Sequence, residues 1–149
     1  MHILFVCHGN ICRSPMAEFI MKDLLQKSGL SRFATVDSVA ATTEEIGHDM
    51  YPPARKKLRE MGIPFSPRRA RLITRADYEA ADLIPVMDEE NVRHLRRLLG
   101  EDRDGKIRFL MDFAGQHREV ADPWYTGDFD QTYEDIREGC EGILKEIRS

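Results

Sequence analysis

The segment CHGNICRSP, which begins at Cys7, places a thiol six positions before an arginine, Arg13, with five residues between them. It follows the run His2–Cys7, whose β-branched and aromatic residues predict a strand. It ends in Ser14 and Pro15, a pair typical of a helix start. A loop between a strand and a helix turns several backbone N–H groups toward one point, where the helix dipole also favours an anion. The segment therefore predicts an anion site suited to phosphate.

Each residue type in this segment suits a role at such a site. Gly9 and Asn10 accept a positive φ, which lets the loop curl its amides inward. The amides, the helix N-terminus and Arg13 favour a thiolate on Cys7, so we expect Cys7 to be a nucleophile. The planar guanidinium of Arg13 can hold two phosphoryl oxygens, and Ser14 can donate its hydroxyl to the thiolate. The residues expected to contact the substrate are His8, Gly9, Asn10, Ile11, Cys12 and Ser14.

A proton donor for a leaving group is expected on a separate loop, and Asp122 is the best candidate. Pro123 holds Asp122 in an extended conformation, and the aromatic residues Trp124 and Tyr125 follow. These rings can form a slot for a planar substrate. Taken alone, this segment fits an Asp-Pro turn with hydrophobic anchors equally well. The Cys7 segment favours the catalytic interpretation.

Strand and helix patterns alternate along the rest of the chain. Apolar runs predict strands over 2–7, 33–40, 83–87 and 107–111. Apolar residues three and four positions apart predict helices that begin near Ser14, Pro52, Thr74, Asp88 and Asp128, the third of them with Asp77 as a capping-box acid. Pro85 removes one ladder donor, which indicates a bulge or a local edge. We predict a single-domain α/β fold over residues 1–149, a doubly wound sheet of about four parallel strands with helices on both faces.

Composition narrows the class of protein. The 149 residues are 42% hydrophobic, and no apolar run approaches the roughly 20 residues that cross a bilayer. The formal net charge of -4 disfavours nucleic acid as a partner. The three cysteines fit a reducing compartment, and no secretory signal is visible, so we expect a cytoplasmic protein. The histidines show no metal-ligand spacing, so we expect no metal site.

The stretch CHGNICRSPMAE near the start, together with DPWY near the end, resembles the low-molecular-weight protein tyrosine phosphatases. Shorter stretches follow in the order that the family has them: Val36-Asp37-Ser38, Tyr51-Pro52-Pro53-Ala54, Met61-Gly62-Ile63, Ala70-Arg71 and Met87-Asp88-Glu89. The resemblance implies hydrolysis of phosphotyrosine, in a protein, peptide or small aryl phosphate, through a phosphocysteine intermediate.

The resemblance also implies roles for particular residues. Cys7, Arg13 and Asp122 would carry the catalysis without a metal or an organic cofactor. Asn10 and Ser38 would join a hydrogen-bond network that holds the loop.

Two departures from the family pattern bear on substrate choice. Glu44 stands where many members have an aromatic pocket wall, and Arg68 stands where many have a histidine that braces the loop. We therefore expect a more acidic pocket than usual. His8 can contact substrate, although a solvent-facing loop histidine is the simpler interpretation.

Alternative functions differ in the residues that they need. Similar arginine phosphatases carry threonine at the position of Ile11, whose aliphatic side chain favours the ring of phosphotyrosine. Glu44 argues the other way, because an acidic rim attracts a guanidinium. A cysteine phosphocarrier domain, a protein of a different class, needs neither Arg13 nor Asp122. An arsenate reductase on this scaffold resembles a relay of further cysteines, and residues 13–139 contain none.

Cys12 leaves two interpretations open. It can protect Cys7 by forming a reversible disulfide under oxidation, or it can be a small buried packing residue.

Overall fold

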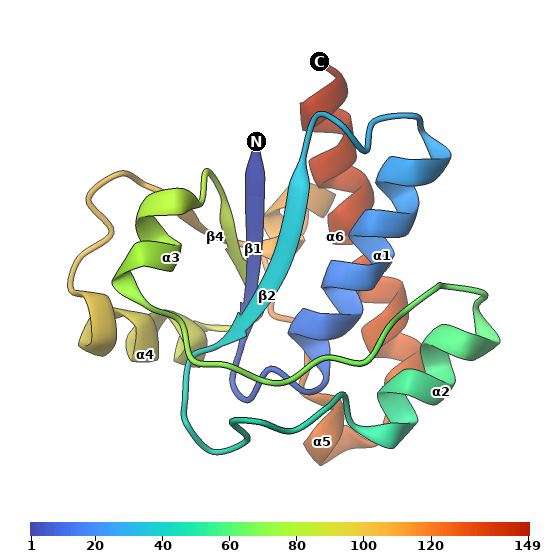
Figure 1. Ribbon diagram of the computed structural model, residues 1–149, viewed down its shortest axis with the longest axis horizontal. Helices are drawn as coiled ribbons and strands as arrows, with labels where there is room; N and C mark the ends of the chain where they lie inside the picture. The colour runs from blue at the N-terminus through green and yellow to red at the C-terminus, as the bar shows by residue number, and fades with distance from the viewer.

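A parallel sheet of four strands forms the centre of the computed structural model, which describes residues 1–149 (Figure 1). The strands are β1 (His2–Cys7), β2 (Thr35–Ala40), β3 (Ile84–Val86) and β4 (Ile107–Phe109). Their order across the sheet is β2-β1-β3-β4. The predicted parallel α/β sheet is confirmed.

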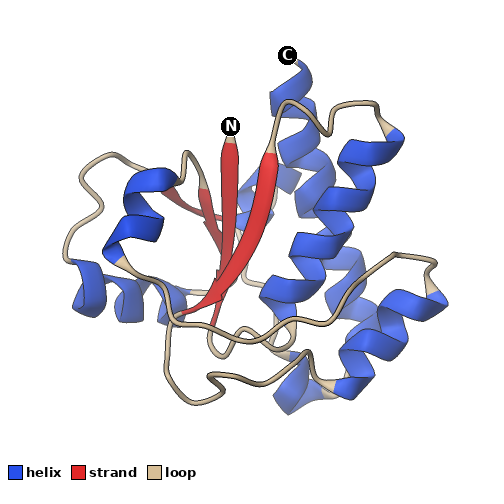
Figure 2. Ribbon diagram, viewed as in Figure 1, coloured by secondary structure: helices blue, strands red, loops and turns tan.

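Helices cover both faces of this sheet (Figure 2). They are α1 (Arg13–Lys27), α2 (Pro52–Glu60), α3 (Arg75–Ala80), α4 (Glu89–Leu99), α5 (Pro123–Thr126) and α6 (Phe129–Arg148), with a 3-10 turn, η1 (Leu110–Ala114). Figure 1 shows α1 and α6 on one side of the sheet and α3 and α4 on the other. None of these helices combines the length and the apolar character that crossing a membrane requires.

The side chains of β1 alternate between two cores, because successive residues of a strand face opposite sides of the sheet. Ile3 and Phe5 are fully buried in the core that α1 and α6 share. Leu4 and Val6 are fully buried in the core beneath α3 and α4. Cys7 belongs to the first core, so β1 delivers its thiol at the α1 side of the sheet.

The strand order places a crevice beside the end of β1. The chain passes from β1 to β2 at one side and then to β3 at the other, which makes the gap between β1 and β3 a topological switch point. Such crevices at the carboxyl ends of parallel strands are where doubly wound folds bind ligands. The loop after β1 and the turn after β3 both end there.

Helix starts follow the side-chain caps in the sequence. The predicted capping box of Thr74 and Asp77 is present at α3, and Asp88 forms another with Asn91 at α4. Asp128 caps α6 by accepting a hydrogen bond from the backbone N–H of Gln131. Each cap satisfies N–H groups that have no partner within the helix.

Three predicted strands are longer than the observed ones. The strand expected over 83–87 spans only Ile84–Val86. The second begins at Thr35 instead of Phe33, because the N–H of Phe33 is bonded to the carbonyl of Leu30 in a turn, at 3.0 Å. The fourth ends at Phe109 instead of Met111, where the chain turns into η1.

The prediction of a local edge or bulge at Pro85 is wrong. β3 lies between β1 and β4, and its pairs with β1 at Ile3–Leu83 and Val6–Val86 are three residues apart on both strands. The N–H of Leu83 donates toward β1 and that of Ile84 donates to Lys106 beside β4, so the missing donor of Pro85 faces β1. The sheet therefore tolerates an interior proline by leaving one ladder bond unmade.

Candidate active site

The β1–α1 loop, residues 8–12, leaves a row of backbone donors free. None of the N–H groups of residues 8–13 donates to an acceptor in the protein. Its carbonyl groups, in contrast, are held from outside: Thr42 donates to the carbonyl of His8 at 3.1 Å, and Tyr51 donates to that of Ile11 at 2.9 Å. Free N–H groups around one point form an anion site.

The start of α1 strengthens this site. Cys12 precedes the helix without a side-chain cap, and the first turn contains no acidic residue. The positive end of the helix dipole is therefore not compensated locally, and an anion is favoured there.

Only one loop residue has the predicted left-handed backbone. Asn10 has a φ of 60°, whereas Gly9, for which we expected the same freedom, does not have a positive φ. The absence of a side chain at Gly9 serves close packing instead, because a Cβ added there would lie 3.1 Å from Cγ of Glu45.

The sulfur of Cys7 lies 3.0 Å from Oγ of Ser14. Asn10, which is fully buried, donates from Nδ2 to Oγ of Ser14 at 2.8 Å and to Oγ of Ser38 at 3.0 Å. Ser38 in turn donates to Oε1 of Glu18 at 2.7 Å. This chain of bonds fixes the hydroxyl of Ser14 beside the thiol, and it contains the residues expected to support the loop.

Arg68 holds the same network from the other side. Its Nη2 donates to Oδ1 of Asn10 at 2.5 Å. The sequence resemblance implies a histidine that braces the loop at this position in many proteins. Here Arg68 stands at that position and contacts the loop. Its Nη1 is buried without a hydrogen-bond partner, which costs free energy of folding.

Arg13 is 2% exposed and held by three groups. Nη1 donates to Oδ2 of Asp88 at 2.6 Å and to the carbonyl of Val120 at 2.9 Å, and Nη2 lies 3.3 Å from Oδ2 of Asp122. Burial opposes the charge of the guanidinium, but the negative charges of Cys7 and Asp88 outweigh it and raise the pKa of Arg13. Arg13 is therefore a fixed cation at the switch point.

Asp122 lies in the loop before α5 and has the expected extended backbone, whereas Trp124 and Tyr125 lie in this short helix instead of in a loop. Oδ1 of Asp122 accepts a hydrogen bond from the N–H of Trp124 at 3.0 Å, which caps α5. Trp124 is 51% exposed and Tyr125 is 83% exposed, so both rings stand out from the surface. The ring of Tyr51 lies 4.7 Å from that of Trp124 and supports it from behind.

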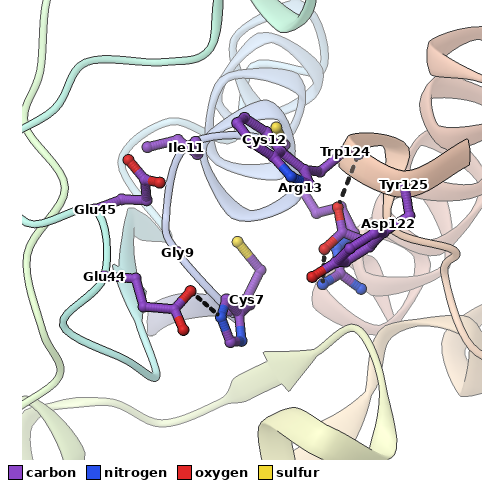
Figure 3. A pocket seen from close by; sticks show the side chains of 11 residues that line it. Cys7, Gly9, Ile11, Cys12, Arg13, Glu44, Glu45, Asp122, Trp124 and Tyr125 are labelled. Atoms are coloured by element: carbon purple, nitrogen blue, oxygen red, sulfur yellow. Dashed lines mark hydrogen bonds and ion pairs between the residues drawn. The ribbon is translucent and has the colours of Figure 1, made fainter. Parts of the chain in front are cut away.

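These groups surround one pocket of about 160 Å³. Figure 3 shows the sulfur of Cys7 pointing into it, with Glu44 and Glu45 on one side and Asp122 and the two aromatic residues on the other. Its lining residues are Cys7, His8, Gly9, Ile11, Cys12, Arg13, Glu44, Glu45, Asp122, Trp124 and Tyr125. The volume is close to the ~150 Å³ that accommodates a benzene ring in an engineered cavity. Asn10 and Ser14, which were expected to contact the substrate, do not line the pocket. Both are buried, and with Ser38 they form the hydrogen bonds that support the loop.

The rim of the pocket is acidic, as the departure at Glu44 predicts. His8 is not a free loop histidine, because its Nε2 lies 2.6 Å from Oε2 of Glu44. Glu45 pairs with Nδ1 of His48 at 2.6 Å. Each of the two carboxylates that face the pocket is therefore already paired with an imidazole.

Several residues of the site were not predicted from the sequence. Asp88 follows β3, and its place at the carboxyl end of a buried strand was the available signal. Glu45 reaches the site from a segment without a distinctive motif. Tyr51 begins the stretch Tyr51-Pro52-Pro53-Ala54, which contributed to the family resemblance but indicated no role for the tyrosine ring. A further group near the rim, His8, Glu90 and His94, brings its ligand-type atoms within 4.8 Å of one another.

Comparison with known proteins identifies the family of the chain. Residues 2–149 match the model of the family described as low molecular weight phosphotyrosine protein phosphatase. The chain belongs to this family. The predicted resemblance, and with it a cysteine-based phosphatase, is confirmed at that level.

Individual relatives agree over almost the whole chain. YfkJ of Bacillus subtilis, named a low molecular weight protein-tyrosine-phosphatase, is 38% identical over 148 residues, which cover 98% of this chain and 95% of that protein. Its crystal structure matches with a TM-score of 0.94 over 99% of this chain and 94% of that chain. DARP, described as a drosophila arginine phosphatase, matches with a TM-score of 0.90 at 30% identity, over 100% of this chain and 99% of that one. The scaffold is thus shared by proteins named for two substrate types.

Proposed function

We propose that this chain hydrolyses phosphotyrosine in proteins or peptides, with Cys7 as nucleophile, Arg13 as phosphate clamp and Asp122 as general acid. The observation that carries the proposal is the loop of free N–H groups around the sulfur of Cys7, closed by the buried guanidinium of Arg13. Such donors stabilise the negative charge that spreads over the phosphoryl oxygens in the transition state.

In the first step the thiolate of Cys7 attacks phosphorus. The S–P bond forms as the bond between phosphorus and the tyrosine oxygen breaks. Asp122, protonated before this step, gives its proton to the leaving oxygen, which departs as neutral tyrosine. Ser14, 3.0 Å from the sulfur, stabilises the thiolate before the attack.

In the second step a water molecule attacks the phosphocysteine. Asp122, now a carboxylate, accepts a proton from that water, the S–P bond breaks, and inorganic phosphate leaves with the thiolate restored. Arg13 holds the transferred phosphoryl group through both steps. A cysteine phosphocarrier needs neither this acid nor this clamp, so their presence supports hydrolysis.

Ile11 supports phosphotyrosine over phosphoarginine. Its side chain lines the pocket together with the rings of Trp124 and Tyr125, an apolar surface that suits a flat phenyl ring. A guanidinium placed there would leave donors unpaired at about 1 to 3 kcal/mol each. Glu44 favours the guanidinium, but its carboxylate is already bonded to His8.

The test compares kcat/KM for two peptides that differ only in carrying phosphotyrosine or phosphoarginine. We expect the wild type to prefer phosphotyrosine at least tenfold, and Cys7→Ser to be inactive on both. Ile11→Thr should reduce the preference for phosphotyrosine. Ile11→Val should leave it unchanged, because valine has the shape of threonine but lacks its hydroxyl. A wild-type preference for phosphoarginine would overturn the substrate, and failure to release phosphate from any aryl phosphate would overturn the hydrolase.

The substrate is proposed to be a phosphorylated protein or peptide in the cytoplasm. The family description supports a phosphoprotein substrate. All three cysteines are free thiols, which suits the reducing conditions of that compartment.

A further inference from the structure

We propose that His8, Glu90 and His94 form a Zn²⁺ site at the rim of the pocket, with Glu44 orienting His8. One ligand comes from the β1–α1 loop and two come from α4. Their candidate ligand atoms lie within 4.8 Å of one another. Two imidazoles and one carboxylate are a ligand set that zinc commonly takes, with a fourth tetrahedral position left for water.

The two ligands on α4 are placed by helix geometry. Glu90 and His94 are four residues apart, so they lie one turn apart on the same face of the helix. This face turns toward His8, whose ring centre is 5.6 Å from that of His94. Loop and helix thus meet across the crevice between β1 and β3.

The three side chains are available to a metal ion. The side chain of His94 makes no hydrogen bond, and its Nδ1 is buried without a partner. No basic side chain pairs with Glu90, although Arg93 and Arg97 are on the same helix. A buried polar nitrogen without a partner costs free energy of folding. A metal ion bound by the imidazole of His94 would give this side chain a partner.

His8 is oriented by a carboxylate outside the ligand set. Its Nε2 lies 2.6 Å from Oε2 of Glu44, and donation to this carboxylate leaves the lone pair of Nδ1 free. A carboxylate that fixes the tautomer of a metal-binding histidine is the usual arrangement around zinc.

The site needs only a small closure to bind the ion. Bonds of about 2.1 Å to a tetrahedral zinc place its ligand atoms about 3.4 Å apart. Glu90 is exposed and can supply the movement by changing its rotamer. The bound ion would join the β1–α1 loop to α4 beside the mouth of the pocket, so zinc would restrain the loop that carries the catalytic residues.

The test measures zinc affinity by competition with a chromophoric chelator, in full-length Cys7→Ser protein so that the catalytic thiolate cannot bind the ion. We expect one equivalent of Zn²⁺ to bind and Mg²⁺ not to compete. His94→Gln and Glu90→Gln should each weaken binding at least tenfold. The matched control is His117→Gln, because His117 is exposed and also lies beside a carboxylate, that of Asp112.

Glu44→Gln should weaken binding by about tenfold, the smaller effect expected of an orienting residue. A second measurement records the imidazole resonances during the titration, where those of His8 and His94 should shift and that of His117 should not. The proposal is overturned if Cys7→Ser binds no zinc, if His94→Gln binds as tightly as the control, or if the resonances of other histidines shift instead.

Discussion

Asp122 makes two contacts in the free protein that bear on its proposed role as an acid. Oδ1 caps α5 and Oδ2 faces Arg13. Asp122→Asn keeps an acceptor for the N–H of Trp124 but has no proton to give, so it separates the acid from the cap. We expect both Asp122→Asn and Asp122→Ala to lose roughly 10² to 10⁴ in kcat on a phosphotyrosine peptide.

The measurement is kcat across aryl phosphates of increasing leaving-group acidity. The loss should shrink as the leaving oxygen needs less protonation. An equal loss for every leaving group would mean that Asp122 positions Arg13 instead of donating a proton.

Asp88 holds Arg13 through the shorter of its two carboxylate contacts, at 2.6 Å. It also caps α4, and asparagine is an equally good cap, so Asp88→Asn removes the ion pair while the helix start is kept. We expect kcat/KM to fall by about 10²-fold, because a clamp displaced by about 1 Å costs that much. Asp128→Asn is the matched control, since Asp128 caps α6 without an arginine partner. Equal activities of the two variants would contradict a positioning role for Asp88.

The part of the site that is continuous in sequence could be predicted, and the part that the fold assembles could not. Cys7 and Arg13 stand in one loop whose neighbours on either side indicate strand and helix. Asp88 meets Arg13 from 75 positions away, and the residues around Asp88 indicate a strand end and a helix cap but no contact with Arg13. His94 likewise becomes a candidate ligand only when α4 packs beside the β1–α1 loop.

Among the elements, α6 depends on two glycines where η1 crosses it. A Cβ added at Gly142 would lie 1.9 Å from the backbone oxygen of Phe113, and one at Gly139 would lie 2.5 Å from the side chain of Leu110. Backbone cannot move aside as a flexible side chain can. We expect Gly142→Ala to lower the free energy of unfolding by about 1 to 3 kcal/mol, despite the better helix propensity of alanine.

Urea unfolding provides the measurement, with Glu134→Ala as control because Glu134 is exposed on the same helix. The control should change stability by no more than about 0.5 kcal/mol. A stabilising Gly142→Ala would show that η1 does not pack against α6 as described.

The same contact explains why the last strand is shorter than its sequence indicates. Residues 107–111 are mostly apolar, and an apolar run alone does not show where a strand stops. The strand ends where Leu110 must reach Gly139 on α6, and that contact is defined only after both elements pack. Capping residues such as Thr74 and Asp77 act within one turn, which is why helix starts were predicted more accurately than strand ends.

At the scale of the whole molecule, the anion site joins segments that are distant in sequence. Arg13 at the start of α1 contacts Asp88 after β3 and Asp122 at the start of α5. An anion bound among the free N–H groups beside Arg13 therefore stabilises contacts across the switch point. Because the formal net charge is -4, nonspecific anion binding is disfavoured. Phosphate also stabilises folded proteins by exclusion from their surface, but only binding at a specific site gives a stabilisation that saturates and depends on Arg13.

We expect inorganic phosphate to raise the melting temperature in a saturable way. At ten times its Kd, a ligand that binds only the folded state adds about 1.4 kcal/mol. For a domain near this size that corresponds to a shift of roughly 3 to 6 °C.

Chloride at equal ionic strength should give little shift, because it matches the screening but not the oxygen geometry. Cys7→Ser should keep the phosphate shift, since the N–H groups and Arg13 remain. Arg13→Lys should reduce the shift, because an ammonium cannot hold two oxygens with a planar fork. If phosphate and chloride stabilised the wild type equally, the free N–H groups would not form an anion site, and the proposed phosphatase mechanism would lose its main support.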